Sequence, residues 1–185
     1  NTGDNIVIPT PVYDMFFHSV ENHGRHVLEC PLQCNDQEYT MDFEDLEKKL
    51  SDPLTTLMIL CNPHNPVGKV WTGEELQKIG SLCKKHHVVV LSDEIHCDLT
   101  LNQAEYVPFA AASAECAQNS ITCIAASKAF NLAGFQSAAV YIPNEGIRAV
   151  MDRGLNSDEV AEPNCFAIES TVAALTKGGE WLDQL

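Results

Sequence analysis

Apolar residues along this chain form short runs that alternate with stretches of helical spacing. The runs predict strands at residues 5–9, 25–30, 56–61, 87–92, 121–126 and 137–142, and the helical spacing predicts helices at 13–21, 42–50, 72–86, 145–153 and 163–177. The run at 56–61 has no polar alternation, which is typical of a strand buried on both faces of a sheet. Residues 154–164 are interpreted as a loop or junction between the last two helices.

Two of the helices begin with capping residues. Asp42 is placed to cap the helix at 42–50, and Thr72 with Glu75 forms the pattern of a capping box. Buried strands that alternate with helices predict an α/β fold, with a mostly parallel sheet and helices on both faces. Ligands bind such sheets beyond the carboxyl ends of the strands, so the chemistry is expected in the loops after the third, fourth and fifth predicted strands.

Length and composition narrow the class of protein. The chain has 185 residues, of which 45% are hydrophobic, enough for one domain or for one domain and part of another. Its 11 basic and 26 acidic residues give a net charge of −15, which disfavours binding to nucleic acid or to an anionic membrane surface. We expect no membrane span and no signal peptide, because the sequence has no run of 18 apolar residues and no basic start followed by an apolar core.

The eight cysteines include no C-x-x-C pair, and several, such as Cys61 and Cys123, lie in apolar runs. Free cysteine packs well as a small core residue. The pattern favours reduced thiols in a cytoplasmic protein over disulfides, and the seven histidines show no spacing with the cysteines that would indicate zinc.

The first of the three loops, at residues 61–68, contains two Asn-Pro steps and a glycine. These residues restrict the backbone to a defined series of turns. A rigid loop without a further role would explain one such step. The doubled step directly after a buried strand instead predicts that Asn65 points its amide into a cleft.

The second loop begins with S-D-E-I-H at residues 92–96. Asp93 directly follows a buried apolar run, so it is either a helix cap or surface acid, or a carboxylate kept ionised to pair with a cationic ring nitrogen. Side chains alternate along a strand, so Asp93 and Ile95 share one side and Glu94 lies on the other. Asp93 is therefore the candidate, and Glu94 is expected to bond with the surrounding structure.

The third loop carries Lys128, which follows the apolar run at 121–126. Many lysines after strands are simply solvated. Lysine is rarely buried without a partner, however, and desolvation at this position would favour the neutral amine, a nucleophile suited to Schiff-base chemistry.

Asn65, Asp93 and Lys128 stand in the motifs N-P-H-N-P-V-G, S-D-E-I-H and S-K-A-F-N-L-A-G. Over nearly all of its length the chain resembles the fold-type I pyridoxal-phosphate enzymes of the aspartate aminotransferase superfamily. His96 after D-E-I, the sequence F-N-L-A-G-F-Q after the lysine, and T-P-V-Y-D-M-F at residues 10–16 resemble the cystathionine β-lyase (C-S lyase) branch, of the MalY/PatB type.

The resemblance implies roles for five of these residues. Lys128 would bind pyridoxal 5'-phosphate covalently and then carry the Cα proton of the substrate. Asp93 would pair with the pyridine nitrogen, and Asn65 would donate to the phenolic oxygen. Tyr13 would stack on the ring, although ordinary packing also explains an aromatic residue there. Ser127 would help to hold the phosphate.

Two positions differ from the pattern of many aminotransferases. His96 stands where they have a tyrosine that donates to the phenolic oxygen, and it either takes that role or lines the site. Gln136 stands where they have an arginine that binds the phosphate, so part of the phosphate's counter-charge is missing. Both differences are expected in the C-S lyase branch and shift the prediction from transamination toward elimination.

Members of this superfamily are considerably longer than this chain, so we expect a fragment truncated at both ends. Residues 1–153 would form the central part of the large cofactor domain, and residues 154–185 a helical segment leading toward a small C-terminal domain. The helix N-terminus that binds the phosphate and the arginine that binds the substrate carboxylate would lie outside the chain. The isolated fragment is therefore expected to bind the cofactor weakly and to be inactive.

For the full-length protein, the resemblance implies a lyase that cleaves the Cβ–S bond of cystathionine or cysteine S-conjugates to pyruvate, ammonia and a thiol. An aminotransferase on the same fold is one alternative, and a non-catalytic regulatory or binding domain is another. The expected partners are a sulfur-containing amino acid and a second copy of the chain in a homodimer, with no nucleic acid, membrane or metal.

Overall fold

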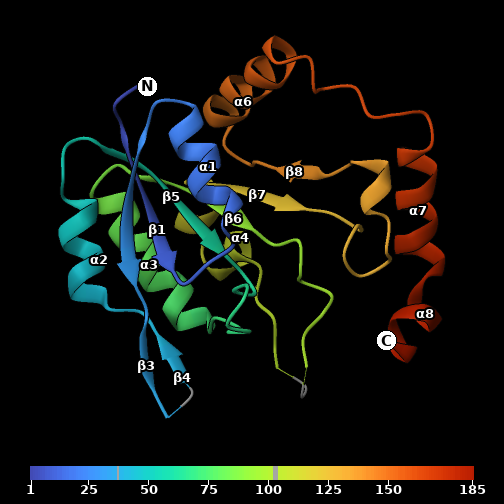
Figure 1. The fold of residues 1–185 in the computed structure, drawn as a ribbon, viewed down its shortest axis with the longest axis horizontal. Coiled ribbons are helices and arrows are strands. Elements are labelled where there is room, and N and C mark those ends of the chain that lie inside the picture. The colour runs from blue at the N-terminus through green and yellow to red at the C-terminus, as the bar shows by residue number, and fades with distance from the viewer. Residues whose placement is uncertain (37, 102–103) are drawn as a thin grey trace.

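A six-stranded sheet forms the centre of the computed structural model, which describes residues 1–36, 38–101 and 104–185 (Figure 1). The strand order is β2-β1-β5-β6-β7-β8. The first five strands in this order are parallel to their neighbours, and β8 runs antiparallel to β7. The strands are β1 (Asn5–Thr10), β2 (His26–Pro31), β5 (Thr55–Cys61), β6 (Val89–Asp93), β7 (Ser120–Ile124) and β8 (Ala139–Tyr141). The predicted mostly parallel sheet is confirmed.

The helices alternate with the strands along most of the chain. They are α1 (Met15–Asn22), α2 (Phe43–Leu50), α3 (Gly73–Lys85), α4 (Phe109–Ala112), α5 (Ala114–Gln118), α6 (Glu145–Ser157), α7 (Ala167–Lys177) and α8 (Gly179–Gln184). A small antiparallel hairpin of β3 (Gln33–Asn35) and β4 (Glu38–Thr40) extends from the end of β2. Within the described ranges, none of these helices is both long enough and apolar enough to cross a membrane.

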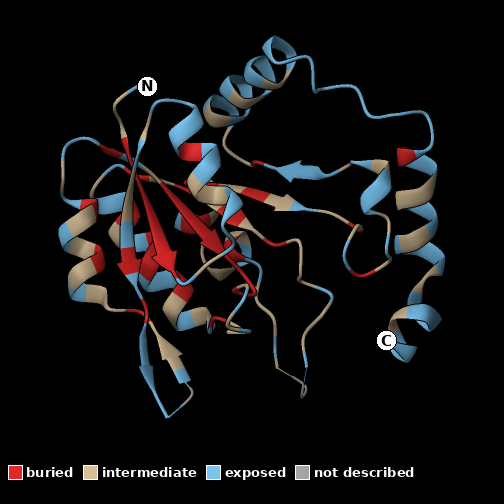
Figure 2. Cartoon of the chain, in the orientation of Figure 1, coloured by how far each residue is buried: buried red, intermediate tan, exposed pale blue. Residues whose placement is uncertain are grey.

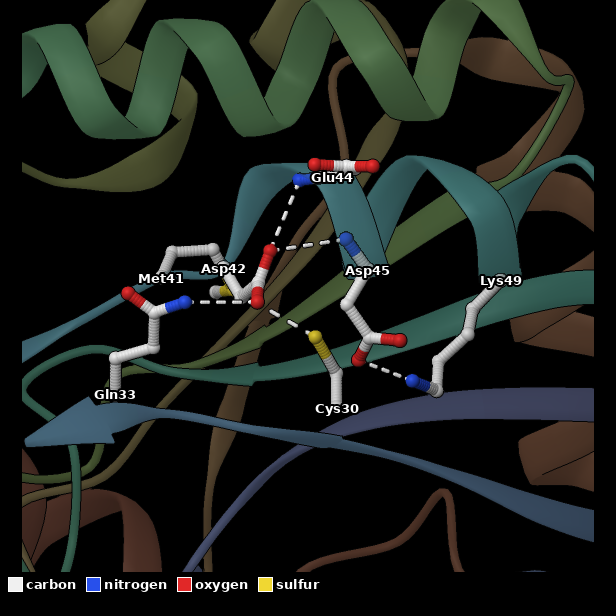
Figure 3. Close-up of polar contacts among 7 residues, drawn as sticks. All are labelled: Cys30, Gln33, Met41, Asp42, Glu44, Asp45 and Lys49. Atoms are coloured by element: carbon white, nitrogen blue, oxygen red, sulfur yellow. Dashed lines mark hydrogen bonds and ion pairs between the residues drawn. The ribbon is translucent and has the colours of Figure 1, made fainter.

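Both predicted caps are present. The carboxylate of Asp42 accepts hydrogen bonds from the N–H groups of Glu44 at 3.1 Å and Asp45 at 3.0 Å, which satisfies two donors at the start of α2 (Figure 3). At α3 the capping box is complete, because the N–H of Glu75 donates to the Thr72 hydroxyl while the Glu75 carboxylate accepts from the Thr72 N–H.

The sheet has an apolar core on each face. Alternation along β1 sends Val7 into the larger core under α2 and α3, and sends Ile6 and Ile8 into a smaller core under α1. All six residues of β1 are buried as a result. The prediction of helices on both faces is confirmed, and the two cores fix the direction in which β1, β5 and β6 deliver their loops.

The structure corrects several predicted boundaries. The helix α6 continues through Gly154 to Ser157, so the interpretation of the whole of 154–164 as a loop was wrong. Gly154 is tolerated there because its helix is exposed, and a glycine in such a position costs only about 1 kcal/mol. The following helix begins at Ala167, not at residue 163. The expected domain division between residues 153 and 154 falls inside α6 and stays a prediction.

Candidate active site

Three parallel strands end side by side at one edge of the sheet. Asp93, the last residue of β6, is paired in register with Cys61 at the end of β5 and with Cys123 in β7. The loops that follow these strands therefore leave the sheet from the same edge. This is the edge at which open α/β sheets bind ligands.

The carboxylate of Asp93 is half-buried and has no cation in contact with it. It accepts one hydrogen bond, from the N–H of Ile95 at 3.2 Å, and it belongs to none of the ion pairs in the described part of the chain. Burial raises the pKa of Asp93, whereas the bond from Ile95 and the positive charges of His96 and Lys128 lower it. A half-buried carboxylate with unused acceptor positions suits a cationic hydrogen-bond donor.

His96 lies in electrostatic range of both Asp93 and Lys128. Its ring is half-buried, and its Nδ1 atom is buried with no hydrogen-bond partner among the described residues. Burial lowers the pKa of His96; the carboxylate of Asp93 opposes that shift, and the charge of Lys128 adds to it. Burial thus favours the neutral imidazole of His96.

Lys128 is exposed, which corrects the expectation of a buried lysine at a strand end. β7 ends at Ile124, and the chain then turns, with the N–H of Phe130 bonded to the carbonyl of Ala126 at 3.0 Å. Small apolar residues such as Ala126 pack equally well in a strand or a turn, so the apolar run could not show where the strand ends. The amine of Lys128 is accessible from solvent to a carbonyl compound.

Asn65 lies in the loop after β5, whose backbone is held in a compact shape. The N–H of Asn62 bonds the carbonyl of Asp93 at 2.8 Å, which links the loop to the end of β6. The N–H of Gly68 bonds the carbonyl of His64 at 2.8 Å, and Gly68 itself has φ of 72°, a conformation that favours glycine. The predicted series of turns is thus present, and Asn65 is half-buried within it.

A cavity of about 580 Å³ lies between this loop and the segment that follows β6. Asn65 lines it from the first loop and His96 from the second. Its other lining residues are Pro63, His64, Pro66, Gly68, Val70, Leu99, Thr100, Leu101 and Ala104. A space of this volume with apolar walls and a few convergent polar groups is typical of a small-molecule site.

Tyr13 and Ser127 are the predicted site residues that the structure connects least to the others. Tyr13 lies just before α1 and is exposed. Its ring packs edge-on against Phe16, with ring centroids 5.7 Å apart, and it does not line the cavity. Ser127 is next to Lys128, and its carbonyl accepts from the N–H of Leu132 at 3.0 Å. Its hydroxyl makes no hydrogen bond within residues 1–36, 38–101 and 104–185, so it is available to a ligand.

The side chain of Glu94 joins the two ends of the second loop by hydrogen bonds. Its side chain is 1% exposed and accepts hydrogen bonds from the hydroxyl of Ser92 at 2.7 Å, from the hydroxyl of Tyr106, and from the N–H of Phe109 at 2.9 Å. The expectation that Glu94 bonds with the surrounding structure is confirmed. Because Tyr106 and Phe109 lie at the far end of the loop, Glu94 holds the segment that carries His96 against the sheet.

One buried residue beside the cavity was missed. His64 stands between the two Asn-Pro steps, is 1% exposed, and packs edge-on against Trp71 with ring centroids 5.8 Å apart. The sequence showed the turns of this loop but gave no signal of where an imidazole inside it would point.

The open polar groups fit a flat aromatic ring that carries a carbonyl and a protonated nitrogen. Among the described residues no cation pairs with the carboxylate of Asp93, Asn65 and His96 line the cavity, and Lys128 offers an accessible amine. The fit to an attached phosphate is less complete. Gln136, exposed and with φ of 48°, brings no positive charge, and Ser127 supplies only a hydroxyl.

Comparisons with known proteins identify relatives of this chain. The family model of aminotransferase class I and II matches residues 1–177. The chain is 50% identical over 183 residues to cystathionine β-lyase PatB of Bacillus subtilis, and 34% identical over 185 residues to protein MalY of Escherichia coli. Among solved structures, cystalysin from Treponema denticola, which contains a pyridoxal 5'-phosphate cofactor, matches with a TM-score of 0.96 at 35% identity.

These matches cover nearly all of this chain but only part of each relative. They extend over 99% of the chain and 47% of PatB, and over 100% of the chain and 47% of the cystalysin chain. The chain thus spans about half the length of the curated relatives it matches. Since the family model matches most of the chain, the chain belongs to the aminotransferase class I and II family.

Proposed function

We propose that the protein carrying this chain is a pyridoxal-phosphate-dependent C–S β-lyase. It cleaves the Cβ–S bond of cystathionine or other cysteine S-conjugates, consuming water and releasing pyruvate, ammonia and a thiol. The observation that carries the proposal is the grouping of Lys128, Asp93 and His96 at the carboxyl edge of the sheet. The 50% identity to cystathionine β-lyase PatB supports the choice of reaction.

Each site residue has a task in this reaction. Bound pyridoxal phosphate withdraws electrons from the substrate Cα, so that the Cα proton becomes acidic and the Cβ–S bond can break. The amine of Lys128 would hold the cofactor and, when free, would take the Cα proton at Nζ. The carboxylate of Asp93 would keep the pyridine nitrogen protonated, a cationic partner that it does not have among the described residues.

The remaining residues orient the ring. The amide of Asn65 donates to its phenolic oxygen, and His96 lies at the same oxygen or lines the site beside it, since both line one cavity. Tyr13 stacks on the ring face. The unbonded hydroxyl of Ser127 contributes to holding the phosphate.

An aminotransferase is the second candidate, because the family model that matches the chain is named for that activity. His96 and Gln136 favour the lyase. The uncharged Gln136 stands where many aminotransferases have an arginine that binds the phosphate. A non-catalytic regulatory or binding domain is the third candidate, and the presence of Asn65, Asp93 and Lys128 together argues against it.

The organisation of the whole protein is part of the proposal. Residues 1–153 form the central part of the cofactor domain, and residues 154–185 lead toward a further domain. The enzyme acts in the cytoplasm, where reducing conditions would maintain its eight free cysteines. It forms a homodimer, which would cover exposed apolar side chains such as Phe166, Ile168 and Trp181.

Incubation of the full-length protein with pyridoxal phosphate and cystathionine tests the proposal. We expect pyruvate and thiol to form in equal amounts without an added keto acid, and we expect Lys128→Ala to abolish both. Turnover that requires a keto acid would assign the protein as an aminotransferase. Absence of turnover, together with absence of the visible absorbance of a lysine-bound cofactor, would favour the non-catalytic candidate.

A further inference from the structure

His64 makes one side-chain hydrogen bond, and its geometry fixes the state of the ring. Its Nε2 lies 3.0 Å from the carbonyl oxygen of Pro11. A carbonyl can only accept, so Nε2 carries the proton and donates it. The other nitrogen, Nδ1, is buried and makes no hydrogen bond of good geometry with the described residues.

This bond joins two loops that are 53 residues apart in the sequence. Pro11 follows the end of β1 and precedes Tyr13 by two positions, and His64 is the immediate neighbour of Asn65. In the proposed function, Tyr13 stacks on the face of the pyridoxal ring and Asn65 donates a hydrogen bond to its edge. The distance between the two loops therefore sets the space in which that ring fits.

Other hydrogen bonds hold the His64 loop to itself and to the segment around β6. Asn62 donates its N–H to the Asp93 carbonyl at 2.8 Å and its side-chain amide to the Val107 carbonyl at 2.9 Å. Within the loop, backbone bonds join His64 to Lys69 and Gly68. Within the part of the chain that the structure describes, the bond from the His64 ring to Pro11 is the hydrogen bond that links residues 62–68 to residues 10–13.

We propose that His64 is a positioning residue, whose bond to Pro11 sets the separation of Tyr13 and Asn65 and so the affinity of the site for the pyridoxal ring. The inference rests on the proposed function, because it takes the roles of Tyr13 and Asn65 from there. His64 lines the cavity beside Asn65, and its contribution is the placement of Tyr13 and Asn65, the two side chains to which contact with the ring is assigned.

Two substitutions separate the hydrogen bond from the volume of the ring. His64→Phe keeps the size of the ring and its edge contact with Trp71 but removes the donor. His64→Gln keeps an N–H donor at a similar distance from the backbone. The control is His86→Phe, at a half-buried histidine that follows α3 and contacts Glu47 away from the cavity.

The measurement is the dissociation constant of pyridoxal phosphate from the full-length protein, by titration of the cofactor-free form, together with thermal unfolding of that form. We expect His64→Phe to weaken binding about tenfold, which corresponds to one buried hydrogen bond and the carbonyl it leaves unpaired. His64→Gln should stay within about threefold of the wild type, and His86→Phe should not change binding. If His64→Phe does not fold, His64→Asn, whose amide is too short to reach Pro11, replaces it with the same expected result.

The spectrum of the bound cofactor supplies a readout that loss of stability alone would not change. A misplaced Asn65 stabilises the phenolic oxygen less, so the pH midpoint of the visible absorbance should move in His64→Phe and return in His64→Gln. Unchanged affinity and midpoint in His64→Phe would overturn the inference, as would a loss of thermal stability with no change in either. No visible cofactor band in the wild type would instead overturn the proposed function.

Discussion

The strands of the central sheet are packed very differently. All six residues of β1 are buried, whereas all three residues of β8 are exposed. The helices α3 and α6 have the same length of 13 residues, yet α3 buries four of them and α6 none. Figure 2 shows the contrast directly, with the buried residues gathered on β1, β5 and β6 and the exposed ones along β8, α6, α7 and α8. We call β1, β5, β6 and the helices packed on them the packed half, and we call β8, α6, α7 and α8 the exposed half.

The candidate site takes residues from both halves. Asp93 and the loop of Asn65 are held by strands with a core on each face, and Glu94 adds a buried network of hydrogen bonds. Lys128 lies in turns beside the exposed half, where the indole N–H of Trp181 donates to the carbonyl of Ala129 at 2.9 Å. The residues that recognise a ring are therefore fixed by the core, whereas the residue that would bind it covalently lies on the less stable part of the structure.

The two tryptophans offer the largest test of this contrast. Trp71 is fully buried, and Trp181 is 54% exposed, while each donates its indole N–H to a backbone carbonyl at 2.9 Å. We expect Trp71→Ala to lower the free energy of unfolding by about 3–5 kcal/mol, because it leaves a cavity and an unpaired carbonyl. Trp181→Ala should cost about 1 kcal/mol, the value of its hydrogen bond.

Urea unfolding followed by circular dichroism measures both variants. Circular dichroism is needed because each variant removes half of the tryptophan fluorescence. Equal losses of stability in the two variants would show that the exposed half contributes as much to folding as the core does, and the contrast would fail.

Asp93 and Lys128 provide the second test, because they compare one site residue from each half. Burial raises the pKa of Asp93, so the folded state holds its proton more tightly than the unfolded state, and its ionised form costs stability at neutral pH. Asp93→Asn should therefore raise the thermal midpoint of the cofactor-free protein at pH 7, while weakening cofactor binding about 10- to 100-fold through loss of the charged hydrogen bond. Lys128→Gln, at an exposed position, should change stability by less than about 0.5 kcal/mol.

The sign of the Asp93 effect has its own check. The gain in Asp93→Asn should shrink as the pH falls toward the ordinary pKa of aspartate, because the wild-type carboxyl then becomes protonated and its penalty disappears. Thermal scans between pH 7 and pH 4 would follow this. A gain that stayed constant over the range would mean that something other than the charge of Asp93 is responsible.

Replacing one helical glycine in each half should change the free energy of unfolding by a smaller amount, and in opposite directions. A Cβ added at Gly80 in α3 would lie 2.3 Å from the sulfur of Cys116, whereas one added at Gly154 in α6 would meet nothing within 4 Å. We expect Gly80→Ala to destabilise the protein by about 1–3 kcal/mol through overpacking. Gly154→Ala should stabilise it by about 0.4–1 kcal/mol, because alanine loses less conformational freedom in a helix. Urea midpoints of the two variants would be compared, and destabilisation by both would contradict the open surroundings of Gly154.

The same contrast explains what the sequence could predict. In the packed half, the apolar runs and the caps at Asp42 and Thr72 mark the elements, because burial on two faces imposes a strong pattern. The hairpin of β3 and β4 was missed because its three-residue strands are mostly polar and exposed. In the exposed half the pattern was weaker, so the end of α6 was placed too early.

The site shows the same limit. Asp93 could be identified from its place at the end of a buried strand, and the alternation of side chains placed Glu94 on the other side. The sequence could not show that Lys128 is exposed or which residue His64 bonds, because both depend on contacts with distant segments. Pro11 is 53 residues from His64, and no local pattern connects them.

The pH dependence of stability provides the last test, and it arises from His64, which is buried in the packed half. Burial lowers the pKa of His64 by more than the bond to the Pro11 carbonyl raises it, so the unfolded state takes up a proton before the folded state does. Its contribution to stability is therefore complete above the ordinary histidine pKa near 6.5 and declines as the pH falls below it, by at most about 1.4 kcal/mol per pH unit. Urea unfolding of the cofactor-free protein at pH 7, 6.5, 6 and 5.5 should show a smaller decline in His64→Gln than in the wild type. The exposed His18→Gln should decline as the wild type does, and a shallower slope in that variant instead would place the titrating histidine outside the packed half.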